Sequence, residues 1–131
     1  MQDIIKDIIS SKRATEAEYR LLQLHVHEPQ DTHQAKHLQR CLELKQRLDR
    51  IDTWLSLLPD DEAFVIRRHL IDGIDIPRIT IEYQERWGNE FGKTERTIKT
   101  YQQRALKRIA AFESRTNNFL ETSTSASHDS F

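Results

Sequence analysis

The stretch "TERTIKTYQQRALKRIAAF", residues 94–112, decides the fold of this chain. Its apolar side chains recur at intervals of 3, 4 and 4, at Ile98, Tyr101, Ala105 and Ile109. This spacing places them on one face of a helix, and that face must be buried against another element. Thr94 stands just before the pattern and is typical of an N-cap residue, whose side-chain oxygen accepts a hydrogen bond from the first turn. The sequence therefore predicts an amphipathic helix over 95–112.

The remaining surface of this predicted helix is basic. Residues 93–115 contain 7 Lys and Arg against 2 Asp and Glu, whereas residues 1–92 contain 13 against 17, and the whole chain has a formal net charge of −1. Lys and Arg neutralise phosphates, and Arg, Thr and Gln form hydrogen bonds with base edges in a major groove that admits one helix. The charge pattern favours a DNA-binding helix, with a solvated face or a helix that binds another protein as alternatives.

Two shorter helices are predicted directly before it. In "LPDDEAFVIRRHLIDG", residues 58–73, Pro59 and three acidic residues mark the start of a helix, and Gly73 marks its end. The next stretch, "IDIPRITIEYQERWG", predicts a helix over 76–87. Two helices, a Gly-containing turn and a capped basic helix follow one another as in a helix-turn-helix, whose last helix enters the major groove.

These residues resemble region four of sigma factors. The matching positions are Leu58, Pro59, Glu62, Gly73, Thr94, Arg96, Thr97, Ile98, Lys99, Arg104 and Ala105. The spacing between the second helix and Thr94 is longer than in that pattern, so either the second helix is extended or the loop forms a wing. The preceding residues leave no room for the promoter-melting region of a complete sigma factor.

The closer resemblance is to the ArpU/RinA-like regulators of bacteriophages and mobile elements, through Ala105, Leu106, Ile109 and Phe112. It implies control of late genes. We expect double-stranded DNA as the ligand, with RNA polymerase as a candidate protein partner. Arg96 and Thr100 are then the expected base-reading residues, because they lie a turn apart at the helix start. The full set of DNA contacts that the resemblance implies is Lys93, Thr94, Arg96, Thr97, Lys99, Thr100, Gln103, Arg104 and Lys107.

The N-terminal half predicts further helices. A long helix should run from about Asp31 to Leu57, because Pro59 is the first breaker after it. Its apolar seam has the spacing 3, 4, 3, 4, 3, at Cys41, Leu44, Leu48, Ile51, Leu55 and Leu58. Such a seam suits either an intramolecular hairpin with the helices before it or a homodimer through the 31–58 helix. Before it we expect a short amphipathic helix near the N-terminus and a helix over 16–27, capped by Thr15 and Glu18.

The whole chain is thus predicted to be all-α, with an N-terminal helical hairpin that includes a long helix, followed by the helix-turn-helix. We expect an oligomerisation or partner-binding region at 1–57, a DNA-binding domain at 58–115 and a flexible tail at 116–131. Trp54 and Trp87 are expected to pack in the core between the two halves. The leading function is sequence-specific regulation of transcription. The alternatives are a DNA-packaging subunit similar to phage small terminases and a helical adaptor that binds the transcription machinery.

Other classes of protein fit the sequence poorly. It contains no Gly-rich phosphate loop, nucleophile elbow or zinc-spacing motif, so we expect neither an enzyme nor a cofactor. His33, His37 and Cys41 share a helix face, but eight residues rise about 12 Å along a helix, and we expect no metal site. A single cysteine and the lack of a long apolar run indicate a cytoplasmic protein that does not span a membrane.

Overall fold

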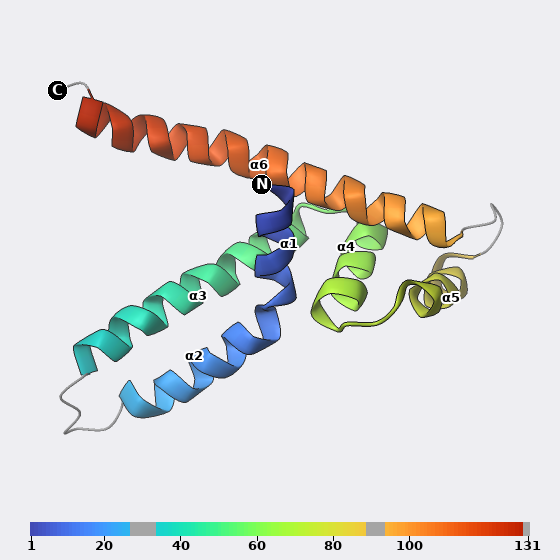
Figure 1. The fold of residues 1–131 in the computed structure, drawn as a ribbon, viewed down its shortest axis with the longest axis horizontal. Coiled ribbons are helices and arrows are strands. Elements are labelled where there is room, and N and C mark those ends of the chain that lie inside the picture. Colours follow the sequence, from blue (N-terminus) through green and yellow to red (C-terminus); the bar gives the residue numbers. More distant parts are fainter. Residues whose placement is uncertain (27–33, 89–93, 130–131) are drawn as a thin grey trace.

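The computed structural model describes residues 1–26, 34–88 and 94–129, and the side chains of residues 1–24, 35–88 and 94–116. The all-α prediction is confirmed, since none of these residues lies in a strand. The elements are α1 (Gln2–Ser10), α2 (Lys12–Val26), α3 (Gln34–Ser56), α4 (Asp60–Ile66), the π-helical turn η1 (Arg67–Ile71), α5 (Ile76–Trp87) and α6 (Glu95–Asp129) (Figure 1).

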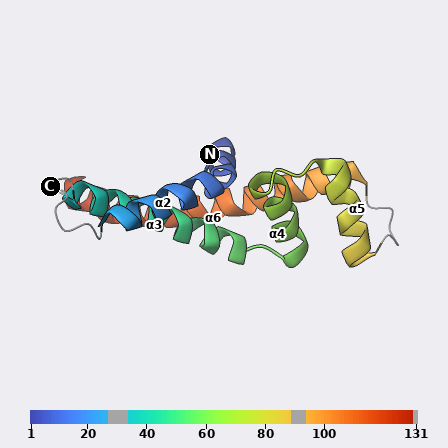
Figure 2. The ribbon, with the colours of Figure 1, turned by 90° about the horizontal axis from the view of Figure 1, so that it is seen from below.

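Helices α2 and α3 form the predicted helical hairpin, which projects away from α4 and α5 (Figures 1 and 2). The apolar seam of α3 is turned inward: Leu48 is half-buried and the other five seam residues are buried. Across the hairpin, Arg40 binds the carboxylate of Glu18 at 2.9 Å. The seam is therefore used within the chain.

The junction between α1 and α2 differs from the prediction. The helix does not begin at Glu16 behind a Thr15 cap but at Lys12, directly after Ser11. Thr15 is buried within the first turns, and its hydroxyl donates to the carbonyl of Ser11 at 3.0 Å. Glu18 cannot complete a capping box because its carboxylate faces Arg40. The capping-box prediction is wrong because a short polar break at Ser11 already separates the two helices.

Two apolar clusters form the core. The larger one joins α1, α3, α4, η1 and α6, and includes Ile5, Ile9, Trp54 and Ile109. The smaller one lies entirely between α4, α5 and α6, and consists of Val65, Ile79, Tyr83 and Ile98. Helix α6 contributes to both clusters. Its first turns pack against α4 and α5, and the turns after them pack against the N-terminal helices.

Helix α6 is longer than predicted. The predicted helix ended at Phe112 and a flexible tail was expected at 116–131, whereas α6 continues to Asp129. No Gly or Pro occurs after Gly92, so no residue of this segment interrupts the backbone hydrogen bonding of a helix. The polar composition of the segment was a poor guide to the end of the helix.

No helix within the described ranges combines the length and apolar character that crossing a membrane requires.

Candidate nucleic-acid interface

The three helices α4, α5 and α6 form a helix-turn-helix arrangement around the smaller apolar cluster. The turn η1 and Gly73, which has a φ of 72°, redirect the chain from α4 into α5. Helix α5 spans the predicted residues and ends at Gly88, which has a φ of 86°. The residues that would decide between an extended second helix and a wing fall in the segment between Gly88 and Thr94. Residues 89–93, including the candidate contact Lys93, lie outside the described residues.

Aromatic side chains fix α5 against its neighbours. Tyr83 stacks on Trp87 with 4.7 Å between ring centroids and approaches Tyr101 of α6 at 5.7 Å. Trp87 also meets the ring of Phe64 on α4, edge to face, at 5.1 Å. The hydroxyl of Tyr83 donates to Asp61 at 3.1 Å, and burial raises the pKa of Tyr83 far above its ordinary value. Trp87 therefore packs against aromatic rings of the helix-turn-helix but is 37% exposed, so the prediction that it lies in the core between the two halves is wrong.

Thr94 occupies the position before α6, as predicted. The backbone N–H of Thr97 points to the hydroxyl oxygen of Thr94 at 3.4 Å, and the N–H of Ile98 donates to the Thr94 carbonyl at 3.1 Å. The first contact satisfies an N–H group of the first turn that has no partner within the helix, and the second is the first regular hydrogen bond of the helix. Thr94 is thus a structural cap of α6.

The outward side of α6 carries a row of polar residues, which we call the basic ridge. Its members are Arg96, Thr100, Gln103 and Lys107, spaced 4, 3 and 4 residues apart. Lys99 and Arg104 flank the row, and every member and flanking residue is exposed except the half-buried Thr100. The guanidinium of Arg104 lies 5.8 Å from the ring of Tyr101. Thr97 is half-buried beside Thr94.

The cations of the basic ridge and its flanks have no carboxylate partner within the described side chains. Cations elsewhere are often paired with a carboxylate: Arg13 binds Asp72 at 2.7 Å, and Arg68 binds Glu82 at 2.7 Å. Arg108, the neighbour of Lys107, also turns away from the ridge and binds the buried Glu62 at 3.2 Å. The positive field of the ridge is therefore not neutralised from within these residues.

Thr100 has only part of its hydrogen-bonding capacity available. Its hydroxyl donates to the carbonyl of Arg96 at 2.9 Å, one turn earlier in the same helix. The two lone pairs of that oxygen can still accept a hydrogen bond from a base amino group, and the methyl group can contact a thymine methyl. Arg96 has no such restriction, so its guanidinium retains its full set of donors.

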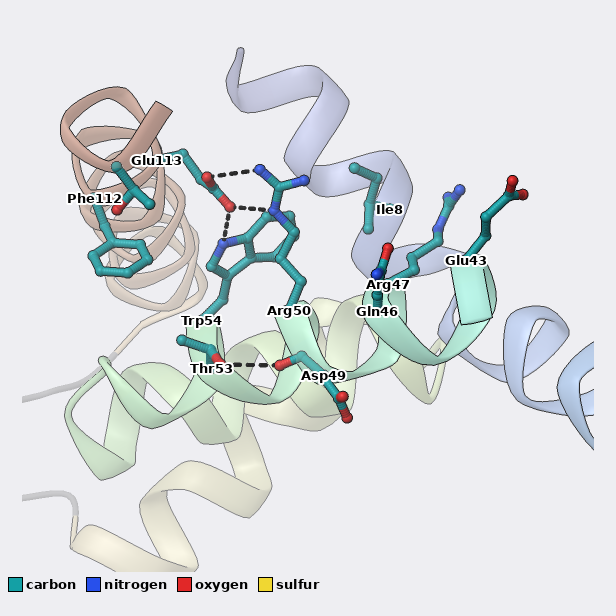
Figure 3. A pocket seen from close by; sticks show the side chains of 11 residues that line it. Ile8, Glu43, Gln46, Arg47, Asp49, Arg50, Thr53, Trp54, Phe112 and Glu113 are labelled. Atoms are coloured by element: carbon teal, nitrogen blue, oxygen red, sulfur yellow. Dashed lines mark hydrogen bonds and ion pairs between the residues drawn. The ribbon is translucent and has the colours of Figure 1, made fainter. Parts of the chain in front are cut away.

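Glu113, one of the two acidic residues in the basic segment 93–115, anchors α6 to α3 (Figure 3). Its carboxylate receives two hydrogen bonds from Arg50, at 2.6 and 2.9 Å, and one from the indole of Trp54, at 2.6 Å. The Arg50 guanidinium holds the pKa of Glu113 below its usual range, against the opposing effect of burial. Glu113 follows Ile109 by four residues on the inward face, and an acid at such a position indicates a cationic partner.

A cavity of about 660 Å³ lies beside this anchor, between α1, α3 and α6 (Figure 3). Ile8, Trp54 and Phe112 give it apolar walls, while Arg47 and Glu43 stand at its edge. No group of three or more metal-ligating side chains occurs within the described part of the chain. His33 lies outside that part, so the grouping with His37 and Cys41 is not described.

Comparisons with models of protein families, with curated proteins and with solved structures gave no match to this chain.

Proposed function

We propose that this protein is a sequence-specific, double-stranded DNA-binding regulator of transcription, with the basic ridge of α6 in the major groove. The resemblance to ArpU/RinA-like regulators suggests that it acts on phage or mobile-element genes in the cytoplasm, alongside RNA polymerase. The observation that carries the proposal is the row of exposed cations on the outward side of α6 that lack carboxylate partners among the described residues.

Electrostatics supports a polyanion as the ligand. A cation that is already paired with a carboxylate loses much of its attraction for phosphate, whereas Arg96, Lys99 and Lys107 keep theirs. Exposed Gln103 and Arg96 add side chains that can bind base edges at two points along one helix face. A purely protein-binding surface would not require this combination of free charge and bidentate hydrogen-bonding groups.

The packing of α6 supports insertion of its first turns. Ile98 and Ala105 are fully buried on the inward side, so the helix has a fixed rotation about its axis. Thr94 caps the end that would enter the groove, and α5 is locked to it through Tyr83 and Tyr101. A recognition helix needs this rigidity because base contacts depend on the position of each side chain.

The test is selection from a pool of randomised DNA duplexes with the full chain, followed by affinity measurements on the enriched duplex at two salt concentrations. The double variant Arg96→Ala/Lys99→Ala should lower the affinity by about tenfold or more and make the salt dependence shallower. Lys6→Ala/Lys36→Ala removes the same charge from two exposed lysines of the N-terminal helices and is the matched control. It should bind like the wild type.

Two results would overturn the proposal. If the selection enriches no sequence, the protein binds DNA through charge attraction only. If the two double variants lose the same DNA affinity, the DNA-binding surface does not lie on α6. If the protein does not bind DNA, and both variants bind a protein partner as the wild type does, the result would support the alternative of a helical adaptor that binds the transcription machinery. Ring-sized oligomers in light scattering would support the small-terminase alternative.

A further inference from the structure

The outer side of α2 carries an apolar row without a partner among the described residues. Its members are exposed and spaced 3, 4 and 3 residues apart: Ala14, Ala17, Leu21 and Leu24. Leu21 is 59% exposed and Leu24 is 69% exposed. The opposite side of α2, with the buried Thr15 and the half-buried Tyr19 and Leu22, faces the hairpin. The outer row is therefore a second seam on a helix whose first seam is already used.

The charges beside this row suit a particular partner. If Ala14 and Leu21 are taken as a positions, Arg13 and Arg20 occupy g positions and Glu18 occupies an e position. In a parallel pair of helices, g residues face e residues of the partner in the next heptad, so Arg13 meets Glu18 of a second copy on both edges. In an antiparallel pair, g residues face g residues of the partner, so the arginines at these positions would repel each other. Both side chains are accessible, since Arg13 is 68% and Glu18 is 46% exposed.

We infer that α2 is the homodimer interface, and that the occupant of its outer row is α2 of a second copy of this chain in parallel orientation. The row offers small residues near the start of α2, where two helices can approach closely, and leucines toward the end, where they interdigitate. Arg13 and Glu18 keep their partners within the chain, at Asp72 and Arg40, because a guanidinium and a carboxylate can each bind more than one group.

The competing surface on α3 is less suitable. Leu38 and Leu42 are 44% and 56% exposed, but their row continues into Lys45 and Asp49, which pair with each other at 3.7 Å. The inward seam of α3 is occupied within the chain. A dimer through the 31–58 helix would therefore have to pack through this partly polar row, or the hairpin would have to open to expose the inward seam.

The parallel orientation has a structural consequence. Arg13, at the start of α2, touches Asp72 at the end of η1, so the beginning of α2 lies beside the helix-turn-helix. Two copies paired in parallel through α2 present both helix-turn-helix units at the same end of the dimer. This inference concerns assembly without DNA, so it stands or falls independently of the proposed function.

The first test is sedimentation velocity of the full chain over a range of concentrations. The wild type should form a concentration-dependent dimer, and Leu21→Glu/Leu24→Glu should be monomeric with an unchanged helical circular dichroism spectrum. Leu38→Glu/Leu42→Glu, which places the same charges on exposed leucines of α3, should still dimerise. A monomeric wild type, a dimer that survives the α2 changes, or a dimer lost only with the α3 changes would overturn the inference.

The second test uses charge and does not depend on the leucine variants. Arg13→Glu chains and Glu18→Arg chains should each dimerise more weakly than the wild type, because like charges then face each other across the parallel pair. Mixing the two variants should restore dimerisation, since each edge regains one Arg and one Glu. Mixtures that remain as weak as the separate variants would exclude the parallel pairing of α2.

Discussion

Trp54 of α3 donates its indole N–H to the carboxylate of Glu113 on α6 at 2.6 Å. Both residues are almost completely buried, and Arg50, on the preceding turn of α3, binds the same carboxylate. This arrangement joins the long helix of the hairpin to the turns of α6 that follow the basic ridge. The position of the candidate DNA-binding surface therefore depends on residues of the N-terminal half.

Trp54→Phe should lower the free energy of unfolding by about 1–3 kcal/mol, because the buried Glu113 carboxylate loses one of its donors and the cavity gains space. Urea denaturation followed by circular dichroism measures the change. Trp87→Phe removes the same atoms from a ring that is 37% exposed, and it should cost less. Equal losses for the two changes would contradict the anchoring role of Trp54.

Glu113 also predicts a pH dependence of stability. Its pKa lies below the ordinary value of 4.5 because Arg50 and Trp54 stabilise the charged form. The stabilisation is therefore fully present above about pH 4.5 and is lost as the pH falls through the lower pKa of the folded protein. The difference in unfolding free energy between wild type and Glu113→Gln should shrink in that acidic range. Urea titrations at several pH values measure it, and a difference that stays constant with pH would count against this linkage.

The adjacent residues Lys107 and Arg108 should behave differently. Lys107→Ala should weaken DNA binding and reduce the slope of log affinity against log salt by about 1, as expected for one lost phosphate contact. Arg108→Ala should leave DNA affinity unchanged but destabilise the fold by about 1–2 kcal/mol, because Glu62 is then buried without its guanidinium. Binding isotherms and urea melts of both variants separate the two roles. A loss of DNA affinity in Arg108→Ala equal to that in Lys107→Ala would show that the ridge extends to Arg108.

Gly73→Ala should destabilise the fold by about 1 kcal/mol, through the backbone alone. Gly73 has a φ of 72°, and no atom lies within 4 Å of the position that a Cβ would occupy. Gly73→Asn is the matched variant, since Asn adopts this conformation at lower cost, and its melting temperature should lie between those of the other two proteins. An alanine variant as stable as the wild type would mean that the turn between η1 and α5 relaxes freely.

Much of the fold follows from local sequence. The spacing of Ile98, Ala105 and Ile109 correctly predicted the buried face of α6, because helical periodicity alone determines which residues share a face. The stretch "IDIPRITIEYQERWG" likewise predicted the bounds of α5, because helix ends depend on nearby residues.

Other features could not be derived from local patterns. Glu113 lies 63 positions from Arg50, and Glu62 lies 46 positions from Arg108, so only the folded chain reveals these pairs. Thr15 and Glu18 match the capping-box pattern, but their position inside α2 overrides it. The ridge residues could be predicted from the helical spacing. The ion pair that turns Arg108 away from the ridge could not, because it depends on the position of Glu62 in the fold.

Helix α6 contains 35 residues without a break, which corresponds to a rod of about 50 Å. A continuous helix is stiff to twisting because its hydrogen bonds link every turn to the next. Because both apolar clusters hold this one rod, a displacement of the N-terminal helices that moves Glu113 would also displace Arg96 and Gln103. Helix α6 is thus a rigid mechanical link between the N-terminal helices and the basic ridge.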